Sequence, residues 1–180
     1  MAQPILPRSE VPKLRVPLAG GGTFDLMENG GERFTLLVFY RGLHCPKCRE
    51  QLQDLHRLRD EFAARGTAVV ALSMDDGERA TRTVSEWRID GLPLGHDITA
   101  AQAQAWGLFL SSGRGMTSAG VEETQVFNEP GLFLVNADGS LFASWVQTVP
   151  FARPPADQLL SMIGFVQEKN YPERGVLEAA

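Results

Sequence analysis

The stretch TLLVFYRGLHCPKC, residues 35–48, decides the fold of this chain, because two different residue patterns meet in it. Residues 35–40 form a continuous apolar run without alternation, which is typical of a central parallel strand that is covered on both faces. After Cys48, apolar residues recur at steps of three and four: Leu52, Leu55, Leu58 and Phe62. This spacing predicts an amphipathic helix that ends near Gly66. The two cysteines of the chain therefore lie at a strand-to-helix junction.

Outward from this junction, strands and helices alternate. Further strands are predicted at residues 67–73, 92–94, 132–135 and 141–146, and further helices at residues 78–89, 98–110 and 155–169. Residues 14–16 and 24–26 flank three glycines and predict an N-terminal hairpin, whereas the glycine- and serine-rich residues 111–128 predict a long surface loop. Parallel strands joined by helices, with an antiparallel edge, indicate an α/β fold with a central mixed sheet.

Length and composition indicate one domain. The chain has 180 residues, of which 43% are hydrophobic and 22% charged, enough for a sizeable core. We expect an N-terminal arm at residues 1–13, the domain at residues 14–168 and a C-terminal tail at residues 169–180. A net charge of −5 argues against nucleic acids and anionic membranes as partners. The first residues lack the apolar stretch of a secretory signal, so a cytoplasmic location is expected.

The two cysteines lie within four residues, in Cys45-Pro46-Lys47-Cys48. A disulfide between them would close almost no loop and add little stability. A redox function is therefore favoured over a structural one. Two other interpretations remain open: a pair of ordinary buried thiols, and a metal site. Zinc needs four ligands, and His56 lies roughly 16 Å along the helix from Cys45, too far to complete a site with it.

The position of Cys45 predicts a reactive thiolate. Pro46 suits the first position of a helix and pushes the residue before it toward the extended backbone of an N-cap. Cys45 would then lie beside unpaired amide groups at the positive end of the helix dipole, which lowers the pKa of its thiol. Lys47 and Arg41 add positive charge, and His44 adds more if it is protonated. We expect Cys45 to be the nucleophile and Cys48, one turn inside the helix and less exposed, to be the resolving thiol.

Residues 38–48 resemble the peroxiredoxin-like branch of the alkyl hydroperoxide reductase/thiol-specific antioxidant family, with His44 at a position that is aromatic in that branch. Residues 92–97 and 130–139 are similar to later segments of the family. The resemblance implies a thioredoxin-like fold with an extra N-terminal hairpin, and a thiol-dependent antioxidant oxidoreductase. Its substrate would be a peroxide, or a protein or small-molecule disulfide, and an external thiol would reduce it again. No cofactor is expected, because the chain lacks a dinucleotide fingerprint, and a homodimer is a possible assembly.

Two departures from the family pattern bear on the reaction. Gly42 stands where a peroxiredoxin has the hydroxyl residue that positions the peroxide, and Glu129-Pro130 stands where the family has an arginine. Pro130 instead resembles the cis-proline of thioredoxins, which favours dithiol–disulfide exchange over peroxide reduction.

The predicted site follows from these considerations. Its catalytic residues are Cys45, Cys48 and Arg41, of which Arg41 would replace the missing arginine. Its substrate-binding residues are Pro130, His44, Pro46 and Lys47. The alternative is a redox-sensing adaptor without turnover, which would contact its partner through residues 111–128.

Overall fold

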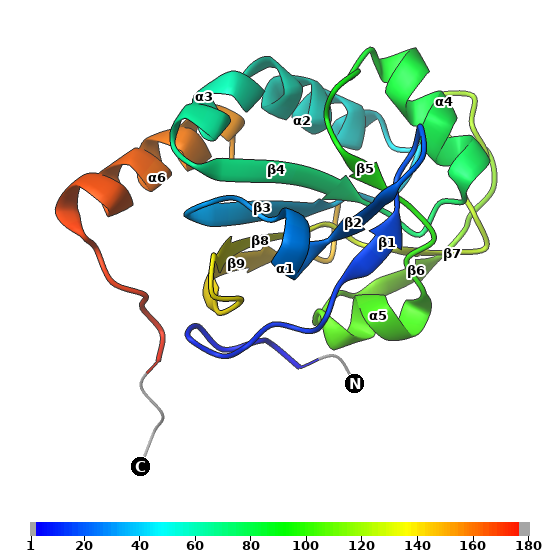
Figure 1. The fold of residues 1–180 in the computed structure, drawn as a ribbon. Helices are drawn as coiled ribbons and strands as arrows, with labels where there is room; N and C mark the ends of the chain where they lie inside the picture. The colour runs from blue at the N-terminus through cyan, green and yellow to red at the C-terminus, as the bar shows by residue number, and fades with distance from the viewer. Residues whose placement is uncertain (1–2, 177–180) are drawn as a thin grey trace.

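The computed structural model describes residues 3–176, which fold around one five-stranded sheet (Figure 1). The strand order is β5-β4-β3-β8-β9. The strands are β3 (Phe34–Phe39), β4 (Thr67–Leu72), β5 (Leu94–Gly95), β8 (Gly131–Asn136) and β9 (Leu141–Val146). Strands β3, β4 and β5 are parallel to one another, whereas β8 and β9 are antiparallel to their neighbours. The predicted mixed sheet is confirmed.

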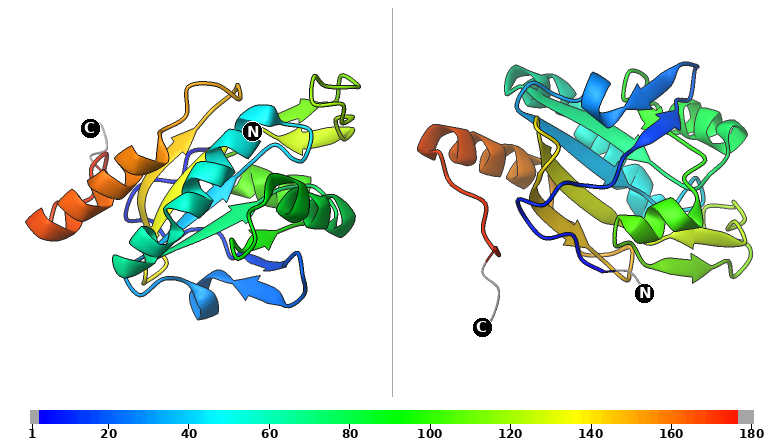
Figure 2. Two further views of the ribbon diagram at one scale, coloured as in Figure 1. Left: turned by 90° about the horizontal axis from the view of Figure 1, so that it is seen from above. Right: turned by 60° about the horizontal axis from the view of Figure 1, so that its bottom comes forward.

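Both faces of the sheet are covered, as the unbroken apolar run of β3 predicts. The side chains of Leu36, Val38 and Tyr40 belong to one apolar core, and those of Leu37 and Phe39 belong to a second core on the opposite face. The first core is completed by α2 (Pro46–Arg57), α3 (Arg59–Ala64), α4 (Gly77–Trp87) and α6 (Ala156–Lys169). The second is completed by α5 (Ala100–Ala105) and by the hairpin of β1 (Arg15–Pro17) and β2 (Thr23–Asp25) (Figures 1 and 2).

Three local predictions are corrected by the structure. The predicted loop at residues 111–128 begins and ends in strands, because β6 (Leu110–Ser112) pairs with β7 (Val126–Asn128) in an antiparallel hairpin. The helix predicted over residues 98–110 is shorter, since α5 ends before Gly107, whose φ of +74° leaves the helical region. The long helix after Cys48 is divided at Leu58 into α2 and α3. A one-turn helix, α1 (Leu26–Asn29), follows β2 and was not predicted.

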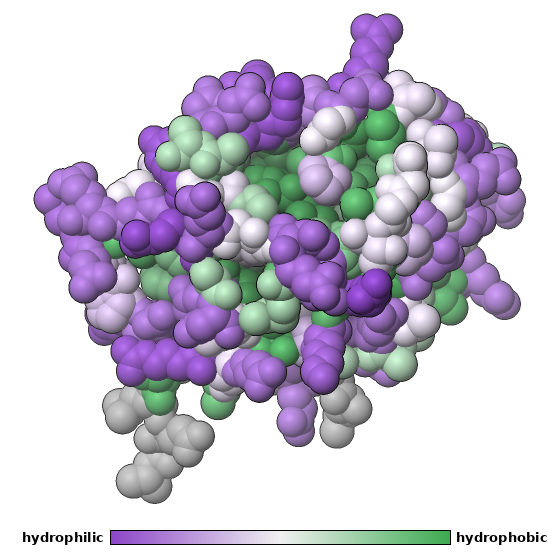
Figure 3. Space-filling model, in the orientation of Figure 1, coloured by the Kyte–Doolittle hydropathy of each residue, from purple (hydrophilic) through white to green (hydrophobic). Residues whose placement is uncertain are grey.

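Residues 8–11 lie along the β8–β9 hairpin. Glu10 forms an isolated bridge with Ser140, and the amide of Val11 donates a hydrogen bond to the carbonyl of Gly139 at 3.0 Å. Figure 3 shows a mostly polar surface with an apolar hollow over β4, between α3 and the β1–β2 hairpin. No helix among residues 3–176 is long and apolar enough to cross a membrane.

Candidate active site

Cys45 is the N-cap residue of α2, as its sequence context predicts. Its backbone is extended (φ −103°, ψ 104°), and Pro46 begins the helix. The amide of Cys48 donates a hydrogen bond to Cys45 Sγ at 3.3 Å. The sulfur therefore takes the place of the side-chain oxygen that usually caps a helix, where an unpaired amide and the helix dipole favour a negative charge.

At neutral pH the two sulfur atoms together hold one proton and one negative charge. The thiol of Cys48, which donates a hydrogen bond to Cys45, lowers the pKa of Cys45 to about 6. The charge of Arg153, the amide of Cys48 and the charge of Arg41 act in the same direction, whereas burial opposes them. Burial, and next the hydrogen bond to Cys45, raise the pKa of Cys48 well above its usual value. At neutral pH, Cys45 is therefore mostly thiolate and Cys48 is a thiol.

Arg153 is the residue that sequence reasoning missed. It lies in the segment between β9 and α6, where its Nη2 is 3.1 Å from Cys48 Sγ and 3.8 Å from Cys45 Sγ. Its Nη1 donates a hydrogen bond to Gln51 Oε1 at 2.7 Å, and its Nε donates to the carbonyl of Pro150 at 2.9 Å. No local motif marks this arginine, because the cysteines that it contacts are 105 and 108 residues earlier in the chain.

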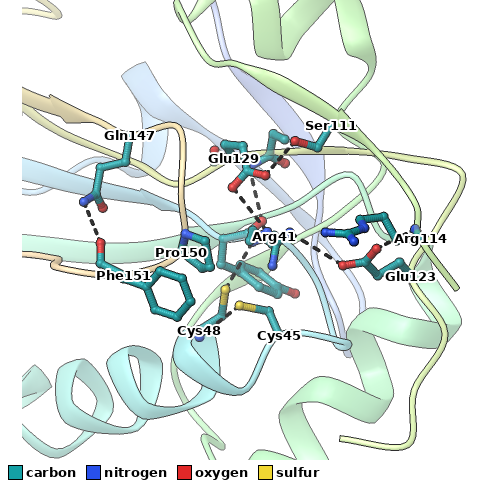
Figure 4. A network of polar contacts seen from close by, with 12 residues as sticks. Arg41, Cys45, Cys48, Ser111, Arg114, Glu123, Glu129, Gln147, Pro150 and Phe151 are labelled. Carbon is teal, nitrogen blue, oxygen red and sulfur yellow. Dashed lines mark hydrogen bonds and ion pairs between the residues drawn. The ribbon is translucent and has the colours of Figure 1, made fainter. Parts of the chain in front are cut away.

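Arg41, which the sequence analysis proposed as a catalytic residue, has its side chain paired with two glutamates. Its Nε is 3.2 Å from Glu129 Oε2 and its Nη2 is 3.6 Å from Glu123 Oε1 (Figure 4). Its contact with the thiols runs through the backbone, whose amide donates a hydrogen bond to Cys48 Sγ at 3.4 Å. Because two carboxylates face the guanidinium of Arg41, most of its charge is compensated. Arg153 instead supplies the side chain that reaches both sulfur atoms.

His44 is a buried aromatic residue and not a source of positive charge. Its side chain is fully buried, and its ring centroid is 4.7 Å from that of Phe127. Burial, and next the charge of Arg41, lower the pKa of His44 to about 4, so the ring is neutral at pH 7. Among the described residues, neither of its nitrogens has a hydrogen-bond partner. His44 was expected to add positive charge beside Cys45 only if protonated, and with this pKa that condition is not met at neutral pH.

Asp75, also missed in the sequence analysis, fixes the loop that carries Cys45. This fully buried carboxylate accepts a hydrogen bond from the amide of Leu43 at 2.7 Å and pairs with Arg79 Nε at 3.0 Å. Gly42 has a φ of +135°, and a Cβ atom there would lie 2.8 Å from Asp75 Oδ1. Glycine is thus required at position 42 by its backbone angle and by the space that Asp75 leaves.

The remaining predicted residues take less direct positions. Pro46 opens α2, and the exposed Lys47 forms an ion pair with Glu50 at 2.8 Å. Pro130 is buried directly before β8, whose first residue, Gly131, is paired with Phe39. None of the peptide bonds of residues 3–176 is cis, so Pro130 does not have the geometry of the thioredoxin proline that it was expected to resemble.

The arrangement is suited to nucleophilic sulfur chemistry. A thiolate, a neighbouring thiol and a guanidinium are the groups needed to attack an O–O or S–S bond and to close a disulfide afterwards. No group of three or more His, Cys, Asp or Glu residues in the described chain could hold a metal ion. Both sulfur atoms are enclosed, since the exposed fraction is 1% for Cys45 and 0% for Cys48. The expected difference in exposure between the two cysteines is therefore negligible in this conformation.

Comparisons with known proteins agree with this fold. A model of the AhpC/TSA family matches residues 7–144, whereas no curated protein matches the chain. Among solved structures, peroxidoxin BcpB from Mycobacterium tuberculosis is similar with a TM-score of 0.68 and 19% identity, over 90% of this chain and 98% of that one. AhpC from Enterococcus faecalis has a TM-score of 0.71 and 14% identity, over 98% and 99%.

A mutant of peroxiredoxin 6 from Arenicola marina is also similar, with a TM-score of 0.75 and 18% identity, over 92% of this chain and 75% of that one. At such identities these structures establish the likeness of the fold. The match to the family model covers more than three quarters of the chain and extends through the cysteine motif.

Proposed function

This chain belongs to the AhpC/TSA family, and on that premise we propose that it reduces hydroperoxides with Cys45 as the nucleophile and Cys48 as the resolving thiol. The observation that carries the proposal is the unequal sharing of one proton between the two sulfur atoms. Cys45, with a pKa of about 6, is ready to attack, whereas Cys48 keeps its proton until it is needed. A protein thiolate with such a neighbour is the usual reactant in peroxide reduction by cysteine.

The reaction would proceed in three steps: oxidation of Cys45, formation of the disulfide, and its reduction by an external thiol. The thiolate of Cys45 attacks one oxygen of the hydroperoxide, the O–O bond breaks, and the other oxygen leaves and takes up a proton to become an alcohol or water. Cys45 is then a sulfenic acid. The sulfur of Cys48 displaces the hydroxyl group of Cys45, which leaves as water with the proton of the Cys48 thiol. The Cys45–Cys48 disulfide can close because Cys45 is the N-cap of α2 and Cys48 is in its first turn. An external dithiol, or two thiols, supplies the two electrons that restore the pair.

Arg153 would act in the first step. Its guanidinium donates toward both sulfur atoms, at 3.1 Å and 3.8 Å, and a fixed cation there stabilises the thiolate and the negative charge that develops on the leaving oxygen. The family's hydroxyl residue is absent, since Gly42 occupies its place. Arg153 would also supply the positive charge that was expected from Arg41, because Arg41 is paired with Glu129 and Glu123.

The test is a pair of single substitutions assayed for consumption of hydrogen peroxide in the presence of a thiol reductant. Cys45→Ser should abolish turnover, because no nucleophile remains. Cys48→Ser should stop at the sulfenic acid, which a sulfenic-acid reagent would trap on Cys45. Substantial peroxidase activity in Cys45→Ser, or no trapped product in Cys48→Ser, would contradict the assignment.

Dithiol–disulfide exchange is a second candidate, favoured by the Cys-x-x-Cys spacing at the start of a helix. In that reaction the thiolate of Cys45 would attack a substrate disulfide, and Cys48 would then release the reduced product. Reduction of insulin disulfides in the absence of peroxide distinguishes the two functions. Either reaction needs a compartment in which the external thiol stays reduced, such as the cytoplasm.

A further inference from the structure

The guanidinium of Arg153 is closer to the sulfur of Cys48 than to that of Cys45, although Cys45 carries the negative charge. Its Nη2 lies 3.1 Å from Cys48 Sγ and 3.8 Å from Cys45 Sγ. The amide of Arg41 donates a second hydrogen bond to Cys48 Sγ, at 3.4 Å (Figure 4). The nearest N–H donor to Cys45 Sγ in the described chain is the amide of Cys48, at 3.3 Å. Two donors, one of them charged, therefore face the sulfur that is protonated at neutral pH.

The position of this guanidinium is set by groups that the reaction does not change. Nη1 of Arg153 donates a hydrogen bond to Gln51 Oε1 at 2.7 Å, and Nε donates to the carbonyl of Pro150 at 2.9 Å. Gln51 is buried and lies on α2, three residues after Cys48. Because this anchor belongs to the helix that carries Cys48, we expect Nη2 of Arg153 to stay beside Cys48 Sγ when the charge of Cys45 changes.

The raised pKa of Cys48 has one permanent cause and two that depend on Cys45. Burial is the largest cause, and it persists through the reaction. The hydrogen bond to Cys45 and the negative charge of Cys45 come next, and both exist only while Cys45 is a thiolate. The charge of Arg153 and its hydrogen bond lower the pKa of Cys48. Part of what keeps Cys48 protonated therefore disappears when Cys45 reacts.

The other titratable or charged groups around Cys48 are either neutral or paired. Tyr40 is buried, and burial raises the pKa of its hydroxyl above its usual range, so this group is neutral at pH 7. The guanidinium of Arg41 is paired with two glutamates, and Asp75 is paired with Arg79. Within the described chain, the guanidinium that faces Cys48 is therefore the cation that responds to a charge on this sulfur.

Oxidation of Cys45 changes which sulfur these donors stabilise. The first step converts the thiolate of Cys45 into an uncharged sulfenic acid. Arg153 Nη2 and the amide of Arg41 then have Cys48 Sγ as the acceptor that can take up a negative charge, and a charged acceptor makes such a hydrogen bond about twice as strong as a neutral one. As the S–S bond forms, the S–O bond of Cys45 breaks with its electron pair. The hydroxyl group takes the proton of Cys48 and leaves as water.

From these contacts we propose that Arg153 and the backbone amide of Arg41 activate Cys48 for the second step, once Cys45 has lost its charge. The proposal rests on the function proposed above and adds that one guanidinium serves both cysteines in turn. Cys48 keeps its proton while Cys45 is the nucleophile, and it becomes the nucleophile when the sulfur of Cys45 has become the electrophile. The order of the two steps is thereby built into the contacts of Cys48.

Titration of Cys48 in the Cys45→Ser variant tests the proposal without peroxide. In this variant a neutral hydroxyl replaces the charged sulfur, and Cys48 is the only thiol of the chain. The ultraviolet absorbance of the thiolate, followed against pH, gives the pKa of Cys48. We expect it to lie at least about two units below the second ionisation of the wild type, because the two contributions of Cys45 are gone. Equal values in the two proteins would overturn the proposal.

Further substitutions in the Cys45→Ser protein assign the effect to the guanidinium. Arg153→Gln should raise the pKa of Cys48 by at least about one unit, whereas Arg153→Lys should retain part of the stabilisation. Gln51→Leu should also raise it, because the guanidinium loses its anchor on α2 while its charge remains. Arg49→Gln is the matched control, since Arg49 is an exposed cation next to Cys48 on α2. A shift in Arg49→Gln as large as that in Arg153→Gln would show that the general charge of the helix, and not the contact, is responsible.

The titration and the peroxidase assay fail independently. An unchanged pKa of Cys48 in Cys45→Ser would overturn its activation by Arg153 and leave the proposed function intact. The expected pKa together with no consumption of peroxide by the wild type would overturn the proposed function, and with it the step for which Cys48 is activated. The expected pKa in an active protein supports both.

Discussion

Two segments meet at the sulfur atoms, and different forces hold them there. The junction, residues 40–48, is fixed by backbone hydrogen bonds, by the start of α2 and by the buried carboxylate of Asp75. The segment of residues 147–155, between β9 and α6, has no regular secondary structure and is held by the side chains of Gln147 and Arg153. The comparison separates two contributions: the junction places Cys45 at the start of α2, and the other segment brings the guanidinium of Arg153 to both sulfur atoms.

The largest expected effect comes from a substitution that breaks the junction. Gly42→Ala would force a Cβ atom to within 2.8 Å of Asp75 Oδ1, at a residue with φ +135°. We expect the free energy of unfolding, measured with urea, to fall by about 1–3 kcal/mol. Gly91→Ala is the matched control, because Gly91 also has a positive φ (+85°) but has nothing within 4 Å of the added atom. Equal losses in both variants would mean that the contact with Asp75 is unimportant.

The second-largest effect is expected on the pKa of Cys45, when Arg153 and Arg41 are substituted one at a time. Wild-type Cys45 should be alkylated with a midpoint near pH 6, in accordance with its lowered pKa. Arg153→Ala should move this midpoint upward, and a rise of about two units would reduce the thiolate fraction at pH 7 roughly tenfold. Arg41→Ala should move it less, since the charge of Arg41 lowers the pKa of Cys45 less than the charge of Arg153 does and is paired with two carboxylates. A larger shift in Arg41→Ala would reverse the roles that the structure gives to these residues.

A smaller effect is the pH dependence of stability in the dithiol form. The pKa of Cys45 is about 6 in the folded chain and about 8.5 in an unfolded one. Between these values only the unfolded chain binds the proton, so the stabilisation grows from pH 6 to about pH 8.5 and is lost below pH 6. The raised pKa of Cys48 opposes it only at higher pH, where an unfolded Cys48 would ionise. The melting temperatures of the wild type and Cys45→Ser should therefore diverge between pH 6 and about pH 8.5. A constant difference between the two melting temperatures over this range would exclude a lowered pKa of Cys45.

The smallest effect is expected at His44. A buried, neutral imidazole whose nitrogens have no partner in the described chain costs free energy of desolvation. His44→Phe should keep the packing against Phe127 and raise the free energy of unfolding by up to about 1 kcal/mol, with an unchanged alkylation midpoint. A loss of peroxidase activity at that unchanged midpoint would instead indicate that His44 transfers a proton.

The same contrast explains how much the sequence could predict. The junction was predicted because its determinants are local: an apolar run for β3, Pro46 at the start of a helix, and two cysteines one turn apart. The five-stranded sheet followed from similar patterns. The hairpin of β6 and β7 was missed because its strands have only three residues each, too few to show a period.

The site was harder to predict wherever it depends on contacts between distant residues. Arg153 reaches cysteines more than a hundred residues away, and Asp75 binds the amide of Leu43 from the loop after β4. Neither contact leaves a pattern in the sequence. Arg41 was selected because it is near Cys45 in the chain, but the carboxylates that occupy its side chain, Glu123 and Glu129, come from a different part of the sequence.

The ion pair of Asp75 and Arg79 also connects the loop before Cys45 to the surface. Arg79 Nη2 donates a hydrogen bond to the carbonyl of Glu122, in the exposed turn between β6 and β7, at 3.0 Å. Three contacts therefore lead from that turn through Arg79 and Asp75 to the amide of Leu43. An insertion or deletion near Glu122 would release one end of this chain of contacts, so this turn on the surface constrains how the protein can diverge.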